Sequence, residues 1–365
     1  MINRLYWASK IYFTSYGIAW FNLDVFTKML KYIGHRRKAT IDELNRLLLS
    51  ETGTRFTRTG KEGYYYAQLL RHLDLAAIIR KRKTYEVALT GYGQSITNKI
   101  LKPGNPRETI DTIRKVFLKW PPLQVFLKYI LTKGKTTPKE VIKDLGGEMK
   151  KWTKILYQLG IAKNIMRKPG VAKPYNKFVV QNLFVPLSQQ LNLVLIQNGK
   201  LQINPEAKET IEKLVTAEKE YDIIKTMPGE YTIYSAIADT LSDAKEAIIA
   251  SPWINGTIVE LVKNTYKISK APKEITIIVR KTKNNINYIK QLTKTPTQIK
   301  AYYYNKLHAK IATNPNGPAA ISSANLVKTS LLRNYEIGIY YQKTPTTITT
   351  ALQELISISA KITTW

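Results

Sequence analysis

The sequence contains no cysteine among its 365 residues. Disulfide bonds and thiolate metal sites are therefore excluded. Histidine is almost as scarce, because the chain has only His35, His72 and His308. Three scattered histidines do not make a metal-ligand cluster. We therefore expect neither a metal nor any other cofactor.

Long apolar runs are also missing. No stretch of about 18 apolar residues occurs, and the N-terminus lacks the cleavable apolar core of a signal peptide. These absences predict a soluble, cytoplasmic protein. The bias toward Ile, Lys and Tyr indicates a thermophile, such as an archaeon.

Acidic residues are few, with 26 Asp and Glu against 57 Lys and Arg, a formal net charge of +31. This excess is more than solubility requires and indicates a polyanionic partner. Nucleic acid is the first choice and an anionic membrane the second. The length and the 44% hydrophobic content are those of a globular protein with two or three domains.

Residues 1–104 have the pattern of a winged-helix domain. A first helix begins near Asn22 and is expected to stop at Gly34, Thr40 and Glu43 form a capping box for a second, and a third covers residues 60–73. Residues 78–90 follow as a basic hairpin. A winged helix places its third helix in the DNA major groove and its hairpin on phosphates. The expected DNA contacts are Lys61, Tyr64, Gln68, Arg71, Arg80, Lys81, Arg82 and Lys83.

Residues 105–184 repeat this pattern and predict a second winged helix. Thr137 and Glu140 form another capping box, for a short helix expected to end at Gly146 and Gly147. A third helix at 148–159 and strands at 161–166 and 178–181 would complete it. The expected DNA contacts are Lys150, Lys151, Lys154, Arg167 and Lys168.

A basic face on one helix is most often a solvated surface. Here the basic faces coincide with the third helix and the hairpin of two units, which favours a nucleic-acid interface. DNA is favoured over double-stranded RNA, because the narrow major groove of RNA cannot admit a helix.

The chain after residue 184 changes character twice. Residues 185–228 predict a linker, with a small hairpin around Asn198 and Gly199 and a charged helix over residues 205–224. From residue 229 to 365 helices and strands alternate, which predicts an α/β domain with a mixed sheet between helices. The expected fold class is therefore multidomain α+β.

The last domain carries polar pairs spaced one residue apart. Alternate residues of a strand share a face, so these pairs would converge on one face and leave an apolar, buried face behind them. An imidazole can attack phosphorus, while an ammonium, a hydroxyl and a carboxamide hold the phosphoryl oxygens. A carboxylate would fix the imidazole tautomer. The three pairs are His308 with Lys310, Ser323 with Asn325, and Asn334 with Glu336.

These residues resemble the motif of the phospholipase D superfamily. That motif runs His, any, Lys, four residues, Asp, six residues, Gly, Ser, any, Asn, followed by a strand with Asn, any, Glu. Pro315 stands at the Asp position and Ser322 at the Gly position. The segment SAIADTLSDAKEAIIASPWI is also similar to the entry of such domains, so the resemblance covers residues 231–365.

The resemblance implies a metal-independent phosphodiesterase. In it His308 attacks phosphorus, Lys310, Ser323 and Asn325 hold the phosphoryl oxygens, and Glu336 orients His308. Members with a single motif hold half of an active site, which implies a homodimer through the C-terminal domain. The same family also implies a phosphohistidine intermediate.

The sequence therefore predicts a DNA-binding nuclease. The alternative is a DNA-binding regulator whose phospholipase D type domain dimerises or senses a phosphorylated ligand, and Pro315 favours it. A phospholipase is disfavoured because no amphipathic or lipid-facing segment is visible, so no membrane partner is expected.

Overall fold

The computed structural model describes residues 2, 4–15, 21–52, 62–81, 84–102, 105–163, 168–171, 173–216, 220–227, 230–268 and 270–363. The chain divides into two compact units. The first holds residues 14–150 and 172–217, and the second holds residues 2–13, 151–171 and 218–365. No helix in these described ranges is long and apolar enough to cross a lipid bilayer.

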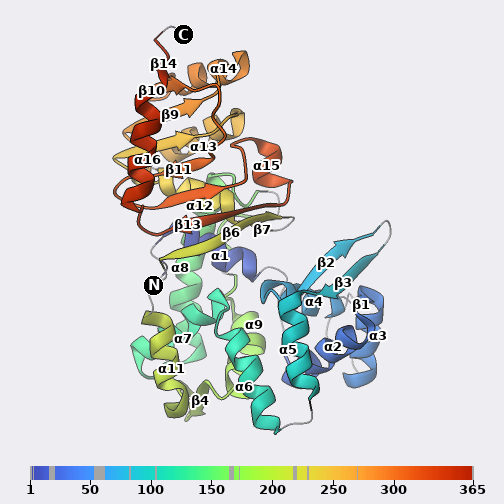
Figure 1. Cartoon of the computed structure of the whole chain (residues 1–365). Helices are drawn as coiled ribbons and strands as arrows, with labels where there is room; N and C mark the ends of the chain where they lie inside the picture. The colour runs from blue at the N-terminus through green and yellow to red at the C-terminus, as the bar shows by residue number, and fades with distance from the viewer. Residues whose placement is uncertain are drawn as a thin grey trace. The chain divides into compact units, whose positions relative to one another are not determined.

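The first unit begins with three helices and a three-stranded antiparallel sheet of order β1-β3-β2 (Figure 1). The predicted capping box forms, since Thr40 N donates to Glu43 Oε2 at 2.7 Å and Glu43 N donates to Thr40 Oγ1 at 3.2 Å. The elements are α2 Leu23–Arg36, β1 Lys38–Thr40, α3 Ile41–Thr52, α4 Glu62–His72, β2 Ala76–Arg80, β3 Tyr85–Leu89 and α5 Gly91–Leu101.

Gly34 does not end the first of these helices, contrary to the prediction. Helix α2 continues to Arg36 and ends at Arg37, whose φ of 64° is left-handed. The apolar side chains of Met29, Leu30 and Ile33 are buried and hold this turn of helix against the core. Packing here outweighs the cost of one glycine, which is only about 1 kcal/mol.

A second group of helices follows, most of it in the first unit, and it contains another hairpin before its last helix; residues 151–158 of α8 belong to the second unit. The hairpin predicted around Asn198 and Gly199 is confirmed. Thr136, just before α8, pairs with Leu201 in an antiparallel bridge. The elements are α6 Pro106–Phe117, α7 Pro121–Lys133, α8 Pro138–Gln158, α9 Lys177–Val179, η1 Val180–Phe184, α10 Val185–Gln190, β4 Val194–Gln197, β5 Lys200–Ile203 and α11 Pro205–Thr216.

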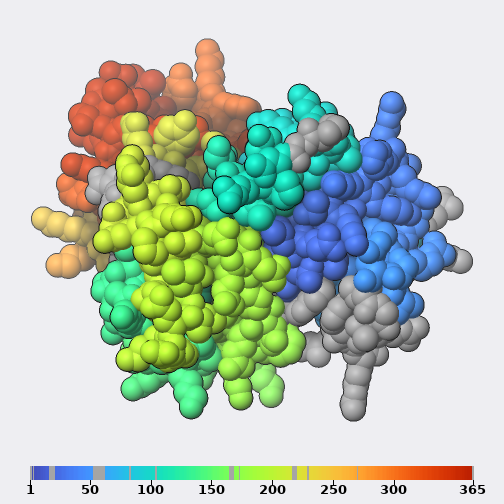
Figure 2. Space-filling view, turned by 90° about the horizontal axis from the view of Figure 1, so that it is seen from below, coloured from blue at the N-terminus to red at the C-terminus, as the bar shows by residue number. Residues whose placement is uncertain are grey.

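The two groups are structural repeats, coloured blue to cyan and green to yellow in Figure 2. In each repeat, a residue with a left-handed backbone follows the third helix: Asp74 with φ of 58° in the first and Asn192 with φ of 53° in the second. The next residue donates its N–H five residues back in both: Leu75 N to Leu70 O at 2.8 Å, and Leu193 N to Ser188 O at 2.8 Å. Each hairpin then runs directly into a helix, α5 or α11. The first repeat is therefore α2–α5, and the second is α7–α11.

The second repeat differs from the predicted second winged helix, which placed its third helix and hairpin too early. Helix α8 runs unbroken through Gly146 and Gly147, because the buried Val141, Leu145 and Met149 keep one apolar stripe across them. Residues 178–181 are helical rather than a strand, since Asn176 caps α9 by accepting Val179 N at 2.9 Å. The third helix is therefore α9 to α10, and the hairpin is β4 with β5.

The second unit is built on a nine-stranded mixed sheet of order β14-β10-β9-β8-β11-β12-β13-β6-β7. Helix α12 packs against β6, β11, β12 and β13. Leu352 of α16 packs with Ala250 and Ile278. The elements are α1 Leu5–Thr14, β6 Tyr221–Met227, β7 Glu230–Tyr231, α12 Thr232–Leu241, β8 Glu246–Ala250, α13 Gly256–Lys267, β9 Glu274–Val279, α14 Lys283–Leu292, β10 Gln298–Tyr303, β11 Ile311–Thr313, β12 Ala319–Ser322, α15 Lys328–Leu332, β13 Glu336–Tyr341, α16 Thr346–Ser357 and β14 Ala360–Lys361.

The predicted helix over residues 205–224 is too long. Helix α11 ends at Thr216, and residues 221–227 form β6 beside β13. Asp222, Ile224 and Thr226 are buried while Tyr221 and Ile223 are exposed. This alternation is the period of a strand, and both of its faces carry apolar residues, which hides it in the sequence.

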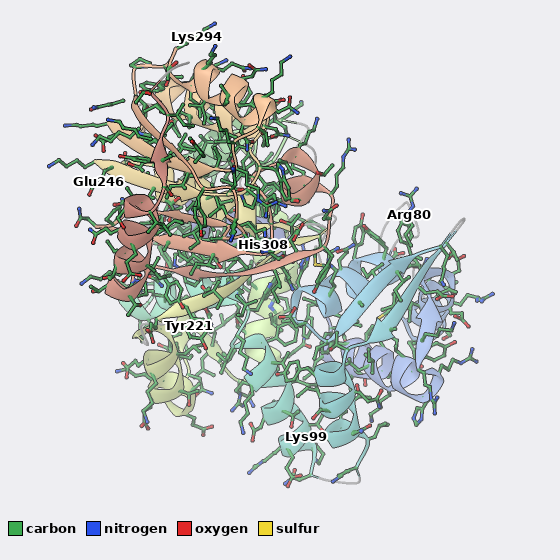
Figure 3. The ribbon with its side chains drawn as sticks, turned by 45° about the horizontal axis from the view of Figure 1, so that its top comes forward. Arg80, Lys99, Tyr221, Glu246, Lys294 and His308 are labelled. Atoms are coloured by element: carbon green, nitrogen blue, oxygen red, sulfur yellow. The ribbon has the colours of Figure 1, made fainter. Side chains whose placement is uncertain are left out.

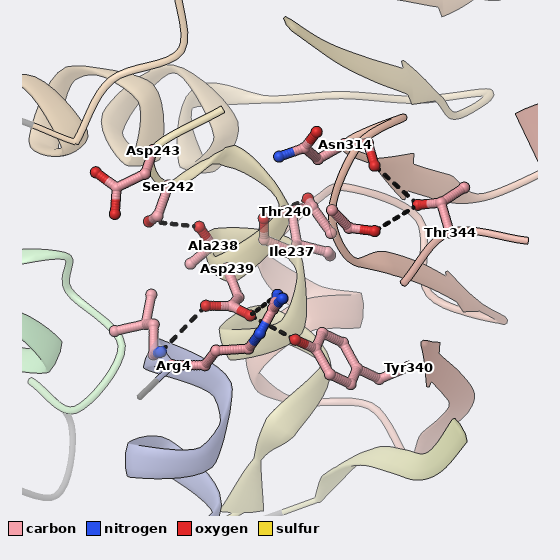
Figure 4. Close-up of polar contacts among 12 residues, drawn as sticks. Arg4, Ile237, Ala238, Asp239, Thr240, Ser242, Asp243, Asn314, Tyr340 and Thr344 are labelled. Atoms are coloured by element: carbon pink, nitrogen blue, oxygen red, sulfur yellow. Dashed lines mark hydrogen bonds and ion pairs between the residues drawn. The ribbon is translucent and has the colours of Figure 1, made fainter. Parts of the chain in front are cut away.

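Helix α1, whose role the sequence does not reveal, packs into the second unit. Buried Asp239 of α12 accepts a hydrogen bond from Leu5 N at 3.1 Å and one from the Tyr340 hydroxyl, and it lies 3.8 Å from Arg4 Nη1 (Figure 4). The rings of Tyr6 and Tyr340 stack with centroids 4.0 Å apart. One carboxylate therefore joins α1, α12 and β13.

Candidate active site

The predicted catalytic residues gather along one edge of the nine-stranded sheet. His308 and Lys310 precede β11, Ser323 and Asn325 follow β12, and Glu336 begins β13. The order β11-β12-β13 places these three segments side by side. The parallel strands β8, β9 and β10 end at the same edge, because β11 runs antiparallel to β8. Ligands of open α/β sheets commonly bind outside the carboxyl ends of such strands. Figure 3 labels His308 in this unit.

His308 and Lys310 lie close together and are accessible. The His308 side chain is exposed. The Lys310 ammonium nitrogen lies 3.3 Å from His308 Nδ1 and 3.5 Å from Nε2, and it donates to the His308 carbonyl at 2.8 Å. An imidazole and a cation thus share one small region, as attack on a phosphate requires.

Glu336 contacts other site residues rather than His308. Its carboxylate accepts hydrogen bonds from the Ser323 hydroxyl and from Asn334 Nδ2, the latter at 3.2 Å. The Ser323 oxygen also accepts Ile337 N at 3.2 Å. The expected bond from His308 to Glu336 is not formed within one chain, and Ser323 and Asn334 donate to the carboxylate instead.

Asn325 has one atom without a partner. Its carboxamide oxygen is buried and has no hydrogen bond to any part of the chain that the structure describes. An unsatisfied buried polar atom costs free energy, and because this atom is an acceptor it does not itself bind a phosphate oxygen. Gly338 supports the site because a Cβ there would lie 2.4 Å from Ile321 O, so only glycine lets β13 approach β12 here.

The environment of Lys310 lowers the pKa of its ammonium group. Burial is the largest cause, the charge of Arg280 adds to it, and Glu336 opposes it. The positive charge of Arg280 therefore acts on Lys310 at this edge of the sheet. A second cation near Lys310 increases the attraction of the site for a phosphate.

Pro315 lies away from this edge. It sits in the turn after β11, at the opposite end of that strand from Lys310. Replacing the motif Asp therefore removes no side chain from the immediate surroundings of His308 in this fold. Ser322, at the Gly position, accepts Ala324 N through its hydroxyl at 3.2 Å and holds the turn that carries Ser323.

Two residues at this edge were missed in the sequence. Trp253 follows β8 and Arg280 follows β9, and the guanidinium carbon lies 4.9 Å from the centre of the indole ring. Both stand just beyond the carboxyl end of a parallel strand, which is the signal that identifies them once the strand order is known.

The apolar face predicted behind the polar pairs is only partly buried. Ala324 is buried, but Ile337 of β13 is 54% exposed. Its register partner on β6 is Lys225, and Ile223, two residues before Lys225 on β6, is also 54% exposed. Tyr335 is exposed as well. Ile337 and Tyr335 therefore expose apolar surface next to Glu336.

The predicted DNA contacts of the first repeat are placed unevenly. Arg80 and Lys81 are exposed at the end of β2, and the Arg80 side chain points away from the ribbon (Figure 3). Tyr64 and Arg71 are half-buried on α4. Gln68 is buried, contrary to the prediction. Lys61, Arg82 and Lys83 lie outside the described residues.

The predicted contacts of the second winged helix do not belong to the third helix or hairpin of the second repeat. Lys150, Lys151 and Lys154 are exposed on α8, and Lys168 is exposed in the segment after it. Lys150 belongs to the first compact unit, while the other three belong to the second. Arg167 lies outside the described residues.

Comparisons with known proteins give only distant similarity. No family model and no curated protein matches the sequence. Among solved structures, NucT from Helicobacter pylori is 19% identical, covering 39% of this chain and 100% of its own, with a TM-score of 0.31. Nuc from Salmonella typhimurium, a phospholipase D family member, is 12% identical over 40% of this chain and 98% of its own, with a TM-score of 0.33. The archaeal chromatin protein TrmBL2 is 15% identical over 69% of this chain and 100% of its own, with a TM-score of 0.27.

Proposed function

We propose that the chain is a DNA-binding, metal-independent phosphodiesterase that cleaves DNA through a phosphohistidine intermediate. The observation that carries this proposal is the exposed His308 imidazole with Lys310 at 3.3 Å, next to Ser323, Asn325 and Glu336 on one sheet edge. An imidazole nitrogen of His308 attacks phosphorus, an N–P bond forms, and the bond to the departing nucleoside oxygen breaks. Water then attacks phosphorus and releases His308.

The proposed roles of the other residues follow from their contacts. Lys310 offsets negative charge on the phosphoryl group, and Ser323 and Asn325 hold its oxygens. Asn325 suits this through the N–H groups of its carboxamide, which donate hydrogen bonds. Glu336 holds Ser323 and Asn334 in place within one chain.

The first repeat is proposed to bind the DNA that this site cleaves. Its helix, strand, helix, helix, hairpin order and its β1-β3-β2 sheet support the proposal that it is a winged helix. The tip of β2 carries Arg80 and Lys81, placed to contact phosphates. The second repeat shares this arrangement, but of the residues on α9, η1 and α10 only Lys177 is basic. DNA binding is therefore assigned to the first repeat.

The active site is proposed to be dimeric. The departing oxygen needs an acid, and the attacking imidazole cannot supply a proton while it is bonded to phosphorus. His35 and His72 both lie in the first repeat. A twofold axis would bring a second His308 to the same phosphate, and twofold dimers are the commonest soluble assemblies. The exposed Ile223, Ile337 and Tyr335 offer an apolar contact beside Glu336.

The second candidate is a DNA-binding regulator whose C-terminal unit binds a phosphorylated ligand without cleaving it. The contacts of Glu336 favour this reading, since the carboxylate faces Ser323 and Asn334 and leaves the His308 tautomer unsupported. The two candidates share the phosphate site and differ in whether His308 attacks.

Cleavage is expected to be independent of divalent metal ions, because Lys310 and amide or hydroxyl donors offset the phosphoryl charge. Purified protein incubated with plasmid and with single-stranded DNA should cleave equally fast in excess EDTA and in magnesium. Gel analysis of the products measures this, with a His308→Ala preparation to exclude a contaminating nuclease. Strict dependence on an added divalent ion would overturn the assignment.

Arg80 and Lys81 are expected to contribute to the salt dependence of DNA affinity. Replacing both with Ala should lower the slope of log affinity against log salt by about one unit for each phosphate that the variant no longer neutralises. Fluorescence anisotropy with a labelled duplex measures the slope. The control replaces Lys99 and Lys102, exposed near the end of α5, which removes the same charge. Equal slopes in both variants would exclude the hairpin as a phosphate-binding element.

A further inference from the structure

Trp253 and Arg280 form a rigid pair next to the catalytic residues. Trp253 is 42% exposed, high for a tryptophan, and the Arg280 guanidinium carbon lies 4.9 Å from the ring centre. Arg280 Nε donates to the Leu307 carbonyl at 2.8 Å. Because Leu307 precedes His308, this bond ties the pair to the nucleophile's own segment.

A buried asparagine fixes both residues. Asn285 is 1% exposed and its side chain bonds to the backbones of three residues around the pair. It donates to the carbonyl of Pro252 at 2.9 Å and to that of Arg280 at 2.8 Å, and accepts Ile254 N at 3.1 Å. The loop that carries Trp253 is thus held on both sides of the indole.

The loop that carries Trp253 is also bonded to Leu326, the residue after Asn325. Buried Ser251 donates its hydroxyl to the Trp253 carbonyl at 2.8 Å and accepts Leu326 N at 3.3 Å. Ile254 and Leu326 also form a parallel bridge. Trp253 therefore stands on a short loop between the segments of His308 and Asn325, both of which are proposed to hold the reacting phosphate.

The Arg280 guanidinium and the exposed Trp253 indole are suited to bind the phosphate and the base of an unpaired nucleotide. The two Nη groups of Arg280 have no hydrogen-bond or ion-pair partner in the described ranges, and a guanidinium binds phosphate oxygens through such groups. An exposed indole on a fixed loop offers a flat apolar surface of the kind on which bases of single strands stack. A paired base inside a duplex does not present its face.

We propose that Trp253 and Arg280 form a nucleotide subsite of the active site. The indole stacks on an unpaired base next to the reacting phosphate, and Arg280 binds a phosphate oxygen. The substrate is therefore single-stranded DNA, or duplex DNA opened at the point of cleavage. This inference rests on the proposed function and adds the form of nucleic acid that the site accepts.

The test compares two short single-stranded oligonucleotides, one complete and one with abasic sites on both sides of its central phosphate. Stacking of one base strengthens binding by about 10- to 100-fold. The wild-type protein should cleave the complete strand faster than the abasic strand by about this factor. Trp253→Ala should lose most of this difference, because it slows cleavage of the complete strand far more than cleavage of the abasic strand. Trp253→Phe should keep most of the difference.

Binding supplies a readout that does not depend on cleavage. Anisotropy with full-length chains carrying His308→Ala, with and without Trp253→Ala, should show the same loss of preference for the complete strand. If no protein cleaves but this preference depends on Trp253, the subsite stands and the nuclease does not. If cleavage is found and Trp253→Ala slows both strands equally, or duplex without openings is cleaved as fast as single strands, the subsite is overturned.

Discussion

His308→Ala is expected to reduce the rate of DNA cleavage by about 10³-fold or more. The imidazole is the proposed nucleophile, so its removal eliminates the N–P bond on which the mechanism depends. The side chain is exposed, so its loss should leave the fold and the affinity of the first repeat for DNA unchanged. Single-turnover cleavage and DNA affinity measured on one preparation check both statements.

Lys306→Ala is the matched control, because Lys306 is exposed two residues before His308. That variant removes a charge from the same segment and should cleave within about threefold of the wild-type rate. Mixed dimers of wild-type and His308→Ala chains, isolated with two affinity tags, test the shared site. A mixed dimer with half of the wild-type rate would contradict the proposal that both copies act on one phosphate.

Asp239→Ala is expected to lower the free energy of unfolding by about 2–5 kcal/mol, because two buried donors lose their acceptor. These donors are the N–H of Leu5 and the hydroxyl of Tyr340. Urea unfolding followed by circular dichroism measures the change. Asp243→Asn is the control, since the exposed Asp243 carboxylate pairs with Lys270 at the surface and Asn tolerates the left-handed backbone there, with φ of 58°. This variant should change stability by no more than about 0.5 kcal/mol. Equal effects of the two substitutions would show that Asp239 does not hold α1 in place.

The same carboxyl gives the stability a pH dependence. Burial raises the pKa of Asp239, although Tyr340 and Arg4 oppose the shift. The folded state thus binds this proton more tightly than the unfolded state. The pKa shift of Asp239 therefore contributes fully to the free energy of unfolding below about pH 4, and this contribution declines as the pH rises through the raised pKa. Asp239→Asn keeps the acceptor oxygen and should lose this decline, which appears in the difference between wild-type and variant stabilities across pH.

Local signals in the sequence predict much of the fold. Both capping boxes, at Thr40 and at Thr137, begin helices, and the two hairpins predicted in the first unit form, β2 with β3 and β4 with β5. The alternation of helix and strand after residue 229 is also found. These features depend on residues a few positions apart, which is why a single sequence reveals them.

Features that depend on distant residues were missed. Helix α1 is apolar on most sides, and its partner Asp239 lies 234 residues after Leu5. The glycine pair in α8 looks like a helix end until the buried stripe on both sides of it is known. The motif residues were predicted on one face of three strands, but most of them lie in the segments at the ends of β11, β12 and β13. Trp253 and Arg280 emerge only from the strand order.

The central claim is that His308 becomes covalently bonded to phosphorus during cleavage. The most direct measurement mixes excess protein with a single-stranded oligonucleotide in EDTA, stops the reaction with detergent at alkaline pH, and records the mass of the peptide that contains His308. The account predicts a nucleotide adduct on this peptide that forms and decays at the rate of cleavage and is absent from His308→Ala. Cleavage without any adduct, or an adduct on another residue, would contradict it.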